Sequence, residues 1–300
     1  MSKPARLAVG VISAGRVGAV LGAALQQAGH IVVAASAVSK DSRVRAAELL
    51  PEAPLLPPDQ VAARADLVLL AIPDDVLAGT VRGLVATGSL RAGQIVVHTS
   101  GAHGVDVLEP AADAGVLPLA LHPVMTFSGR AEDLQRMVAC SFGVTAAEHD
   151  EAAWHVAEAL VVEMGGEPVR VPQAARPLYH AALAYAANNL ITLVTEGADL
   201  LRSAGVGAGL GQPERLLAPL LSAALDNALR HGDRGLTGPV ARGDAGTVRA
   251  HLRALAETAP AVLPSYRTLA GRTADRAVVA GLLSEGAADE VRAALREDTA

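Results

Sequence analysis

A series of short apolar runs recurs along the first half of the chain, and most are followed by a turn and a segment with helical spacing. Runs of this length, bounded by turn formers, are typical of strands that are buried on both faces of a parallel sheet. Their alternation with helical segments predicts an α/β fold with a doubly wound, mostly parallel sheet. The runs lie at 7–12, 31–35, 66–73, 94–99, 116–121, 141–145 and 168–171.

The strand pattern stops after Pro172, and helical periodicity takes over. The spacing predicts one long helix over 175–202 and a flexible break at 205–213. Further helices are expected at 216–230, at 246–258, from 265 onward and at 287–300. We therefore expect an α/β domain at 1–172 and an all-helical domain at 173–300.

Composition narrows the class of protein. Hydrophobic residues make up 51% of the chain and charged residues 19%, which is typical of a globular protein. The net charge of −6 argues against nucleic acid as a partner. Cys140 is the only cysteine, so an internal disulfide or a cysteine-based zinc site is excluded, and we expect no metal site. No apolar run is long enough to predict a membrane span, and a cytoplasmic location is expected.

The strongest local signal is a strand, a tight turn and a helix over 7–28. A turn of small residues lets backbone N–H groups approach a pyrophosphate, and the helix N-terminus that follows favours its negative charge. In the usual fingerprint three glycines stand where this chain has Ser13, Gly15 and Gly18, so the first is replaced by serine. The predicted cofactor-binding turn consists of Ser13, Ala14, Gly15, Arg16, Val17 and Gly18.

The end of the second strand indicates which dinucleotide binds. An acidic residue there would bond the 2′-hydroxyl of NAD. This chain instead has Ser36, followed by Ser39, Lys40 and Arg43, which suit a 2′-phosphate. NADP(H) is therefore favoured over NAD(H), although Asp41 stands against this and a solvated loop would show the same residues.

Other strand ends supply further candidates, because ligands of such sheets bind beyond the carboxyl ends of the strands. Ile72, Pro73 and Thr99 are expected to contact the cofactor, and Ser100 and His122 to contact the substrate. The alternative is ordinary turn chemistry, since Ser-Gly and His-Pro both mark loops. His98 lies inside a strand and is expected to be a packed histidine.

The long helix predicted over 175–202 carries a polar stripe. His180 and Asn188 are two turns apart, and Asn189 adds a second amide. Adjacent amides in an apolar helix need polar partners, which a bound substrate or a neighbouring helix would supply. Thr237 and Arg242, in the loop at 235–244, are further candidates for substrate binding, with a surface Arg–Asp pair as the alternative for Arg242.

The order of these motifs resembles a bacterial family with a Rossmann-like domain and a helical C-terminal domain of formerly unknown function. It is related to the group of 6-phosphogluconate, 3-hydroxyisobutyrate, ketopantoate and pyrroline-5-carboxylate dehydrogenases and reductases. The resemblance implies a nicotinamide-binding domain, an all-helical second domain and a homodimer built through that second domain. The motifs are the segments at 13–18, 71–74, 98–101, 122–123, 179–180 and 236–239.

The chain departs from the hydroxyacid members of that group, which use a helical lysine to protonate the carbonyl oxygen, because it has no lysine after Lys40. Our hypothesis is an NADPH-dependent oxidoreductase that reduces a small 2-oxo acid in an interdomain cleft, with ketopantoate as a named candidate. His180 would act as the acid, Asn188 would orient the carbonyl, and Tyr179 and Tyr266 are reserve donors. The alternatives are a pyrroline-5-carboxylate-type imine reductase, a non-catalytic NADP-binding regulator or scaffold, and an interaction protein with a vestigial first domain.

Overall fold

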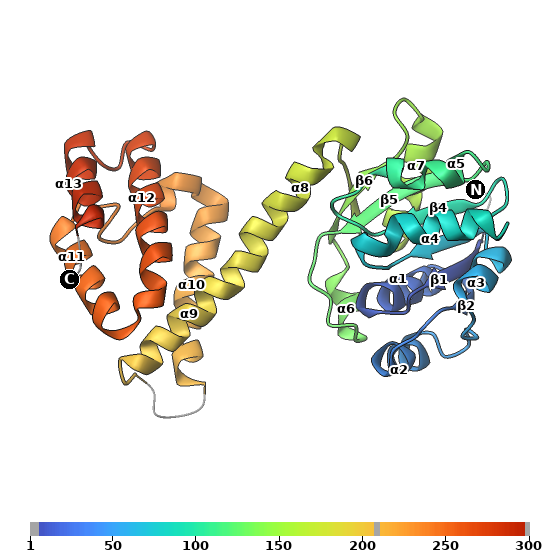
Figure 1. Cartoon of the computed structure of the whole chain (residues 1–300), viewed down its shortest axis with the longest axis horizontal. Coiled ribbons are helices and arrows are strands. Elements are labelled where there is room, and N and C mark those ends of the chain that lie inside the picture. The colour runs from blue at the N-terminus through green and yellow to red at the C-terminus, as the bar shows by residue number, and fades with distance from the viewer. Residues whose placement is uncertain (1–5, 207–210, 298–300) are drawn as a thin grey trace. The chain divides into compact units, whose positions relative to one another are not determined.

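The computed structural model describes residues 6–206 and 211–297. The chain forms two compact units, Met1–Ala184 and Tyr185–Ala300 (Figure 1). The predicted domain boundary between residues 172 and 173 stays a prediction.

A seven-stranded sheet forms the centre of the first unit, in the order β2-β1-β3-β4-β5-β6-β7. Strands β1 to β5 are parallel, β6 is antiparallel to β5, and β7 is parallel to β6. The doubly wound, mostly parallel sheet expected from the sequence is therefore confirmed. The strands are β1 (Ala8–Ile12), β2 (Ile31–Ala35), β3 (Leu67–Leu70), β4 (Ile95–His98), β5 (Leu117–Pro123), β6 (Ser141–Thr145) and β7 (Glu167–Arg170).

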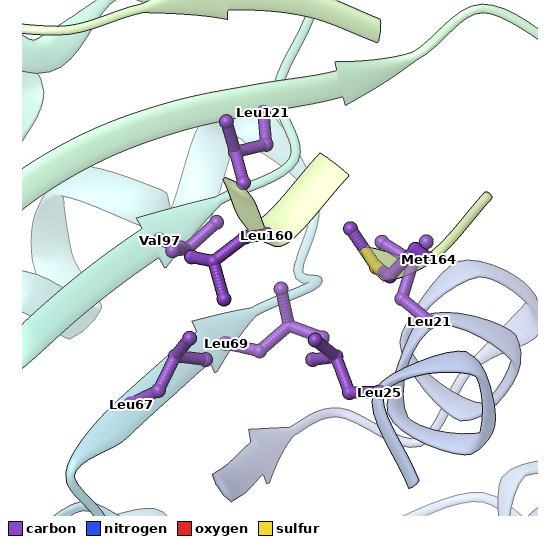
Figure 2. Close-up of a pocket in the computed structure, with 8 residues that line it drawn as sticks. All are labelled: Leu21, Leu25, Leu67, Leu69, Val97, Leu121, Leu160 and Met164. Atoms are coloured by element: carbon purple, nitrogen blue, oxygen red, sulfur yellow. The ribbon is translucent and has the colours of Figure 1, made fainter. Parts of the chain in front are cut away.

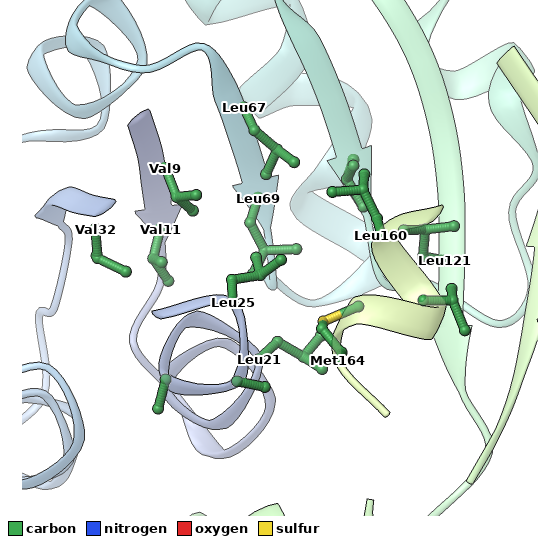
Figure 3. Packing of buried hydrophobic residues seen from close by; sticks show 14 of the residues in the cluster. Val9, Val11, Leu21, Leu25, Val32, Leu67, Leu69, Leu121, Leu160 and Met164 are labelled. Carbon is green, nitrogen blue, oxygen red and sulfur yellow. The ribbon is translucent and has the colours of Figure 1, made fainter. Parts of the chain in front are cut away.

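Helices cover both faces of this sheet. Side chains of successive strand residues point to opposite faces, so Leu69 packs with α1 and α7 while Leu70 packs with α3, α4 and α5. Figure 3 shows the first of these two cores. The helical elements of the unit are α1 (Arg16–Gln27), α2 (Lys40–Leu49), α3 (Pro58–Arg64), α4 (Asp74–Ala86), η1 (Val105–Leu108), α5 (Glu109–Ala112), α6 (Glu132–Arg136), α7 (Glu151–Glu163), η2 (Gln173–Ala175) and α8 (Arg176–Leu183).

A small apolar cavity lies inside the first core, between α1, α7 and the sheet (Figure 2). Its volume is about 10 Å³. Every side chain that lines it is either aliphatic, such as Leu21, or a thioether, as in Met164. A water molecule needs at least this space and polar partners as well. The cavity is therefore a packing void and offers no site for a ligand.

Because of the strand directions, the polar residues at the strand ends lie at one edge of the sheet. Strands β1 to β5 all end there, and the reversed β6 begins there, with Gly143 opposite His122 in the β5–β6 ladder. This edge carries the turns that follow β1, β3 and β4, where the sequence predicts cofactor and substrate contacts.

The helix predicted over 175–202 is not uniform. It consists of α8, a π-helical turn η3 (Ala184–Asn188) and α9 (Asn189–Ser203). A π turn accommodates one more residue than an α turn and is frequent at functional sites. The uniform helical spacing assumed for His180 and Asn188 is therefore wrong.

Every element of the second unit is helical over the part of it that the structure describes. The core lies between α11, α12 and α13, around Val248, Ala274 and Val291. Helix α10 begins before the predicted Leu216, because Pro213 fits the first turn of a helix. Part of the break predicted at 205–213, residues 207–210, lies outside the described residues. After α9 come α10 (Gln212–His231), η4 (Gly232–Gly235), α11 (Ala245–Thr258), η5 (Pro260–Val262), α12 (Leu263–Val279) and α13 (Glu285–Arg296).

Over residues 6–206 and 211–297, no helix combines the length and the apolar character that crossing a membrane requires.

Candidate active site

The turn between β1 and α1 has a backbone shape that suits a phosphate. Ser13 has φ +74°, in the left-handed region that glycine adopts without strain. A Cβ on Gly18 would collide with the Ser13 carbonyl oxygen and would lie 2.9 Å from Ala71 Cβ. Gly18 therefore lets α1 pack close to the turn and to the end of β3.

The N-terminus of α1 is open to an anion. Its N-cap residue, Gly15, has no side chain to cap the first N–H groups, and the first turn contains no acidic residue. The first N–H groups of a helix have no partner within the helix, and their dipoles favour negative charge. This observation shows that the residues fit the pyrophosphate of a dinucleotide.

Ser36 fixes this turn to the end of β2. Its Oγ accepts a hydrogen bond from the Ser13 N–H at 2.8 Å, and its carbonyl oxygen accepts one from the Ala14 N–H at 2.7 Å. Ser36 is buried. Its side chain thus holds the turn in shape, a task that the sequence reading did not assign to it.

The other residues that are predicted to bind the 2′-phosphate lie at the start of α2. Ser39 is the N-cap of this helix, and its Oγ accepts the Ser42 N–H. Lys40 and Arg43 are exposed on the first turn of the helix, as is Asp41. The arrangement leaves both cations accessible to an anion.

Ile72, Pro73 and Thr99 occupy the ends of β3 and β4. Pro73 is the N-cap of α4, and the Thr99 N–H donates to the Leu70 carbonyl oxygen. Ile72 and Thr99 are half-buried and Pro73 is exposed. They lie at the same edge of the sheet as the β1–α1 turn, and their contact with a cofactor stays a prediction.

His98 is a packed histidine, as expected. Its Nδ1 accepts the Ser100 N–H, so Nε2 carries the proton and donates to the Gly104 carbonyl oxygen at 2.8 Å. Burial lowers the pKa of His98 to about 4, and the nearby Arg176 charge acts in the same direction. A neutral His98 thus fixes the loop that begins at Ser100. The Ser100 hydroxyl accepts two N–H groups of the same loop.

Three aromatic side chains meet beyond the end of β5. His122 Nδ1 is 2.9 Å from the Tyr179 hydroxyl, and the His122 ring lies edge-on to His180 with 6.1 Å between their centroids. A Cβ on Gly101 would lie 2.6 Å from His180 Cδ2 and 2.9 Å from His122 Nε2. Gly101 therefore leaves the space in which these two imidazoles approach each other. We call His122, Tyr179 and His180 the histidine–tyrosine cluster.

Arg176, at the start of α8, is 1% exposed, and its Cζ lies 5.6 Å from the centroid of the Tyr179 ring. It donates to Thr145 Oγ1 and to three carbonyl oxygens, and among the described residues no carboxylate pairs with it. A buried charge is normally paired. The guanidinium therefore leaves a net positive charge beside the strand ends. The carbonyl oxygens belong to Ser100, Ala120 and Gly143.

The same charge changes the acid–base properties of its neighbours. Burial, then Arg176, then His180 lower the pKa of His122 to about 4. Burial lowers the pKa of Arg176 itself to about 10 and raises the pKa of the Tyr179 phenol. At neutral pH His122 is uncharged. Its Nδ1 and the Tyr179 hydroxyl form one hydrogen bond, whose direction depends on the tautomer of the imidazole.

The remaining predicted residues belong to the second unit. Asn188 and Asn189 are exposed there, and Asn189 lines a cavity of about 580 Å³. Thr237 lines a second cavity, of about 390 Å³, beside the hydrogen-bonded pair of His251 and Tyr266. The two cavities share four lining residues. These are Leu193, Glu196, Ser265 and Leu269.

Arg242 is exposed in a turn and lines neither of these cavities. His180 belongs to the first unit and Asn188 to the second. Joint action of His180 and Asn188 stays a prediction.

The sequence reading missed Arg176 and Gly143 and left Tyr179 as a reserve donor. A Cβ on Gly143 would collide with the Tyr179 hydroxyl, so this glycine makes room for the phenol. The only signal in the sequence was the Tyr179-His180 pair. Nothing local showed that Arg176 would point into the sheet, because its partners are 31 to 76 residues away along the chain.

Two family models match the chain. Residues 1–123 match the Rossmann-like domain, and residues 140–273 match a domain of unknown function, DUF2520. A comparison with curated proteins found no match.

Several solved structures share the fold. A provisionally assigned NADP oxidoreductase from Bacteroides fragilis has a TM-score of 0.73 and 22% identity, over 90% of this chain and 98% of that one. The reductive aminase from Aspergillus terreus, in complex with NADPH and ethyl levulinate, has a TM-score of 0.62 and 18% identity, over 96% and 99% of the two chains. The pyrroline carboxylate reductase from Plasmodium falciparum, with NADP bound, has a TM-score of 0.52 and 12% identity, over 96% and 98%.

Proposed function

We propose that this chain, which combines a Rossmann-like domain with a DUF2520 region, is an NADP(H)-dependent oxidoreductase acting on a small substrate. The observation that carries the proposal is an uncapped, acid-free α1 N-terminus at the same sheet edge as the histidine–tyrosine cluster. NADPH, when bound, supplies the hydride. The likeness in fold to a reductive aminase and a pyrroline carboxylate reductase supports this class of reaction.

The spacing of the strands suits a dinucleotide. Strand β1 is separated from β5 by three steps across the sheet, through β3 and β4. Neighbouring strands lie about 4.8 Å apart, so the β1–α1 turn and the end of β5 are separated by roughly 14 Å. An extended dinucleotide with its pyrophosphate at Gly15 would reach the strand ends near His122.

The protein's own groups supply the proton and the orientation. His180 Nδ1 or Nε2 would donate a proton to the reduced group, since imidazole transfers protons near neutral pH. Neutral His122, held by the Tyr179 hydroxyl, would orient the substrate, and Tyr179 is a second donor. Asn188 is proposed to hold the carbonyl or imine, as the sequence indicated.

The buried charge of Arg176 supports an acidic substrate, since a positive potential at the strand ends attracts a carboxylate. A 2-oxo acid is therefore our first candidate, with ketopantoate as one test compound. A cyclic imine is the second, favoured by the likeness to a pyrroline carboxylate reductase and by the lack of any lysine after Lys40.

The preference for NADP(H) rests on α2. Lys40 and Arg43 are exposed at its first turn, and Ser39 lies at the N-cap, where a 2′-phosphate would also meet the helix dipole. We propose that these residues bind that phosphate.

Calorimetric titration with NADPH and with NADH tests the proposal first. Trp154 is a poor reporter of binding because it contacts Arg170 of β7, which lies at the far end of the sheet from β1. We expect micromolar binding of NADPH, weaker binding of NADH, and oxidation of NADPH with an oxo acid or a cyclic imine. His180→Gln is expected to lose turnover and keep NADPH affinity.

Each other outcome has a definite meaning. NADPH binding without turnover on a broad panel would favour a non-catalytic regulator. The absence of binding to either dinucleotide would remove the oxidoreductase proposal and favour an interaction protein. Full turnover by His180→Gln would remove His180 as the proton donor.

We also propose a homodimer built through the second unit. Helix α10 buries only Pro213 of its own residues, and it exposes Leu216, Leu220, Leu225 and Leu229. Most of the stability of a protein helix comes from packing an apolar face. A second copy of the chain would cover these leucines.

A further inference from the structure

A tight turn at Ser128 and Gly129 is held by a buried carboxylate. Asp133 is 0% exposed, and its Oδ2 accepts the N–H groups of both Ser128 and Gly129 at 2.7 Å, while its Oδ1 accepts the Ser128 hydroxyl. Burying a carboxylate costs free energy unless it is well bonded. The three hydrogen bonds offset this cost, and they fix the position of the turn that connects β5 to α6.

Two arginines pack against that turn. A Cβ on Gly129 would lie 2.7 Å from Arg45 Nε and 2.9 Å from Arg16 Cγ, and Gly129 has φ +79°. Only glycine fits both the space and the backbone conformation. Arg45 comes from α2 and Arg16 opens α1, so residues distant in the sequence converge within a few ångströms.

The two cations have no acidic partner. Within residues 6–206 and 211–297, neither Arg16 nor Arg45 forms an ion pair, and the nearby Asp133 is occupied by the turn and by Arg136. Two cations without an acidic partner beside one turn raise the local positive potential. A phosphate at this turn would lower that potential and accept a charge-assisted hydrogen bond from Arg45.

The place of this group within the first unit indicates which anion. Arg16 is the first residue of α1, directly after the turn that we propose for the pyrophosphate, and α2 carries the proposed 2′-phosphate residues Ser39, Lys40 and Arg43. Helices α1, α2 and α6 lie in one region of the unit (Figure 1).

We propose that Arg45, Arg16 and the turn at Gly129 form a phosphate clamp for the bound dinucleotide. The clamp rests on the proposed function, since it requires a nucleotide at the β1–α1 turn. Arg45 is the specific addition, because neither the fingerprint nor the start of α2 includes it. Its ligand is a phosphate group, either the 2′-phosphate or the pyrophosphate.

The test is calorimetric titration of Arg45→Gln with NADPH, NADH and 2′,5′-ADP. We expect NADPH affinity to fall about tenfold, the loss of one charge-assisted hydrogen bond. If the clamp holds the 2′-phosphate, 2′,5′-ADP weakens in parallel and NADH is unchanged. If it holds the pyrophosphate, NADH weakens together with NADPH, because both dinucleotides carry that group. Either pattern supports the clamp.

Two further variants sharpen the test. Arg82→Gln removes the same charge from an exposed position on α4 and should leave all three affinities within twofold of the parent chain. Gly129→Ala keeps every charge but displaces both arginines, and it should weaken NADPH as Arg45→Gln does. Circular dichroism of each variant shows whether it is folded.

The two failures can be told apart. If the parent chain binds NADPH and Arg45→Gln binds all three ligands within twofold of it, the clamp is wrong and the proposed function stands. If the parent chain binds neither dinucleotide, both are wrong.

Discussion

Arg176 shows how one buried side chain can organise a candidate site that is built from several elements. Its guanidinium joins the loop after β4, strand β5 and strand β6, through Ser100, Ala120 and Gly143. It also stands one helical turn before Tyr179 and His180, so the same bonds fix where α8 starts. The position of the histidine–tyrosine cluster relative to the strand ends therefore depends on Arg176.

Two histidines held neutral by burial make the stability of the first unit depend on pH. The pKa of both His98 and His122 is lowered to about 4 in the folded chain, from an ordinary value of 6.5. Between these values the unfolded chain binds more protons, so stability falls as pH falls from 7 and levels off below 4. Each histidine contributes a loss of about 2 kcal/mol between pH 7 and pH 5.

We expect His98→Gln to lose about 2 kcal/mol less unfolding free energy than the parent chain between pH 7 and pH 5. The variant is nevertheless expected to be less stable than the parent chain at pH 7. Urea unfolding followed by the emission of Trp154, the only tryptophan, reports on the first unit. His155→Gln, at an exposed position, is the matched control and should keep the parent slope. An unchanged slope in His98→Gln would show that His98 is not held neutral.

At the scale of elements, the β1–α1 turn combines strain with an open helix end. Ser13 adopts a left-handed conformation that costs a non-glycine residue about 1–2 kcal/mol. Its N–H bond to Ser36 does not depend on its side chain. We therefore predict that Ser13→Gly stabilises the first unit by about 1 kcal/mol and keeps NADPH binding, which urea unfolding and calorimetry would measure.

Ala139→Gly provides the comparison, because Ala139 has φ +63° outside the turn. It should give a similar gain in stability with no change in affinity. Gly18→Ala should abolish binding, since its Cβ would collide with the Ser13 carbonyl oxygen. Loss of binding in Ser13→Gly would instead mean that the serine side chain itself holds the nucleotide.

The elements that the sequence predicts well are those coded locally. The apolar runs at 31–35 and 141–145 coincide with β2 and β6 because each is a buried strand with turn formers at its ends. The reversal of β6 could not be read in the same way, since an apolar run carries no direction. The π turn at Ala184–Asn188 has the composition of ordinary helix, and so periodicity alone missed it.

In the candidate site, too, the features that could be predicted are the local ones. The fingerprint at 13–18 is a local motif that its residues reveal, although the left-handed conformation of Ser13 is one that serine disfavours. The bond from Ser13 to Ser36 and the contacts of Arg45 with Gly129 join residues that only the folded sheet brings together. Contacts of this kind need the tertiary structure.

At the scale of the whole molecule, the second unit has more apolar surface than its own core can cover. Its hydrophobic core lies between α11, α12 and α13, whereas Leu220 and Leu229 of α10 are 62% and 80% exposed. Leu220 and Leu229 are nine residues apart and lie on opposite sides of α10. Exposed apolar side chains on both sides of a helix mark it as an interaction element. A twofold dimer in which the second copy packs around α10 would bring the same surface of each copy together.

We predict that sedimentation equilibrium of the parent chain gives the mass of a dimer, and that Leu220→Glu and Leu229→Glu shift it toward the monomer because charges would be buried at the contact. Val279→Glu, which places the same charge at an 86% exposed position on α12, should remain dimeric. A monomeric parent chain would contradict the homodimer, and dimeric α10 variants would place its interface elsewhere. If dimerisation and NADPH turnover fall together in the α10 variants while Val279→Glu keeps both, catalysis needs the assembled pair.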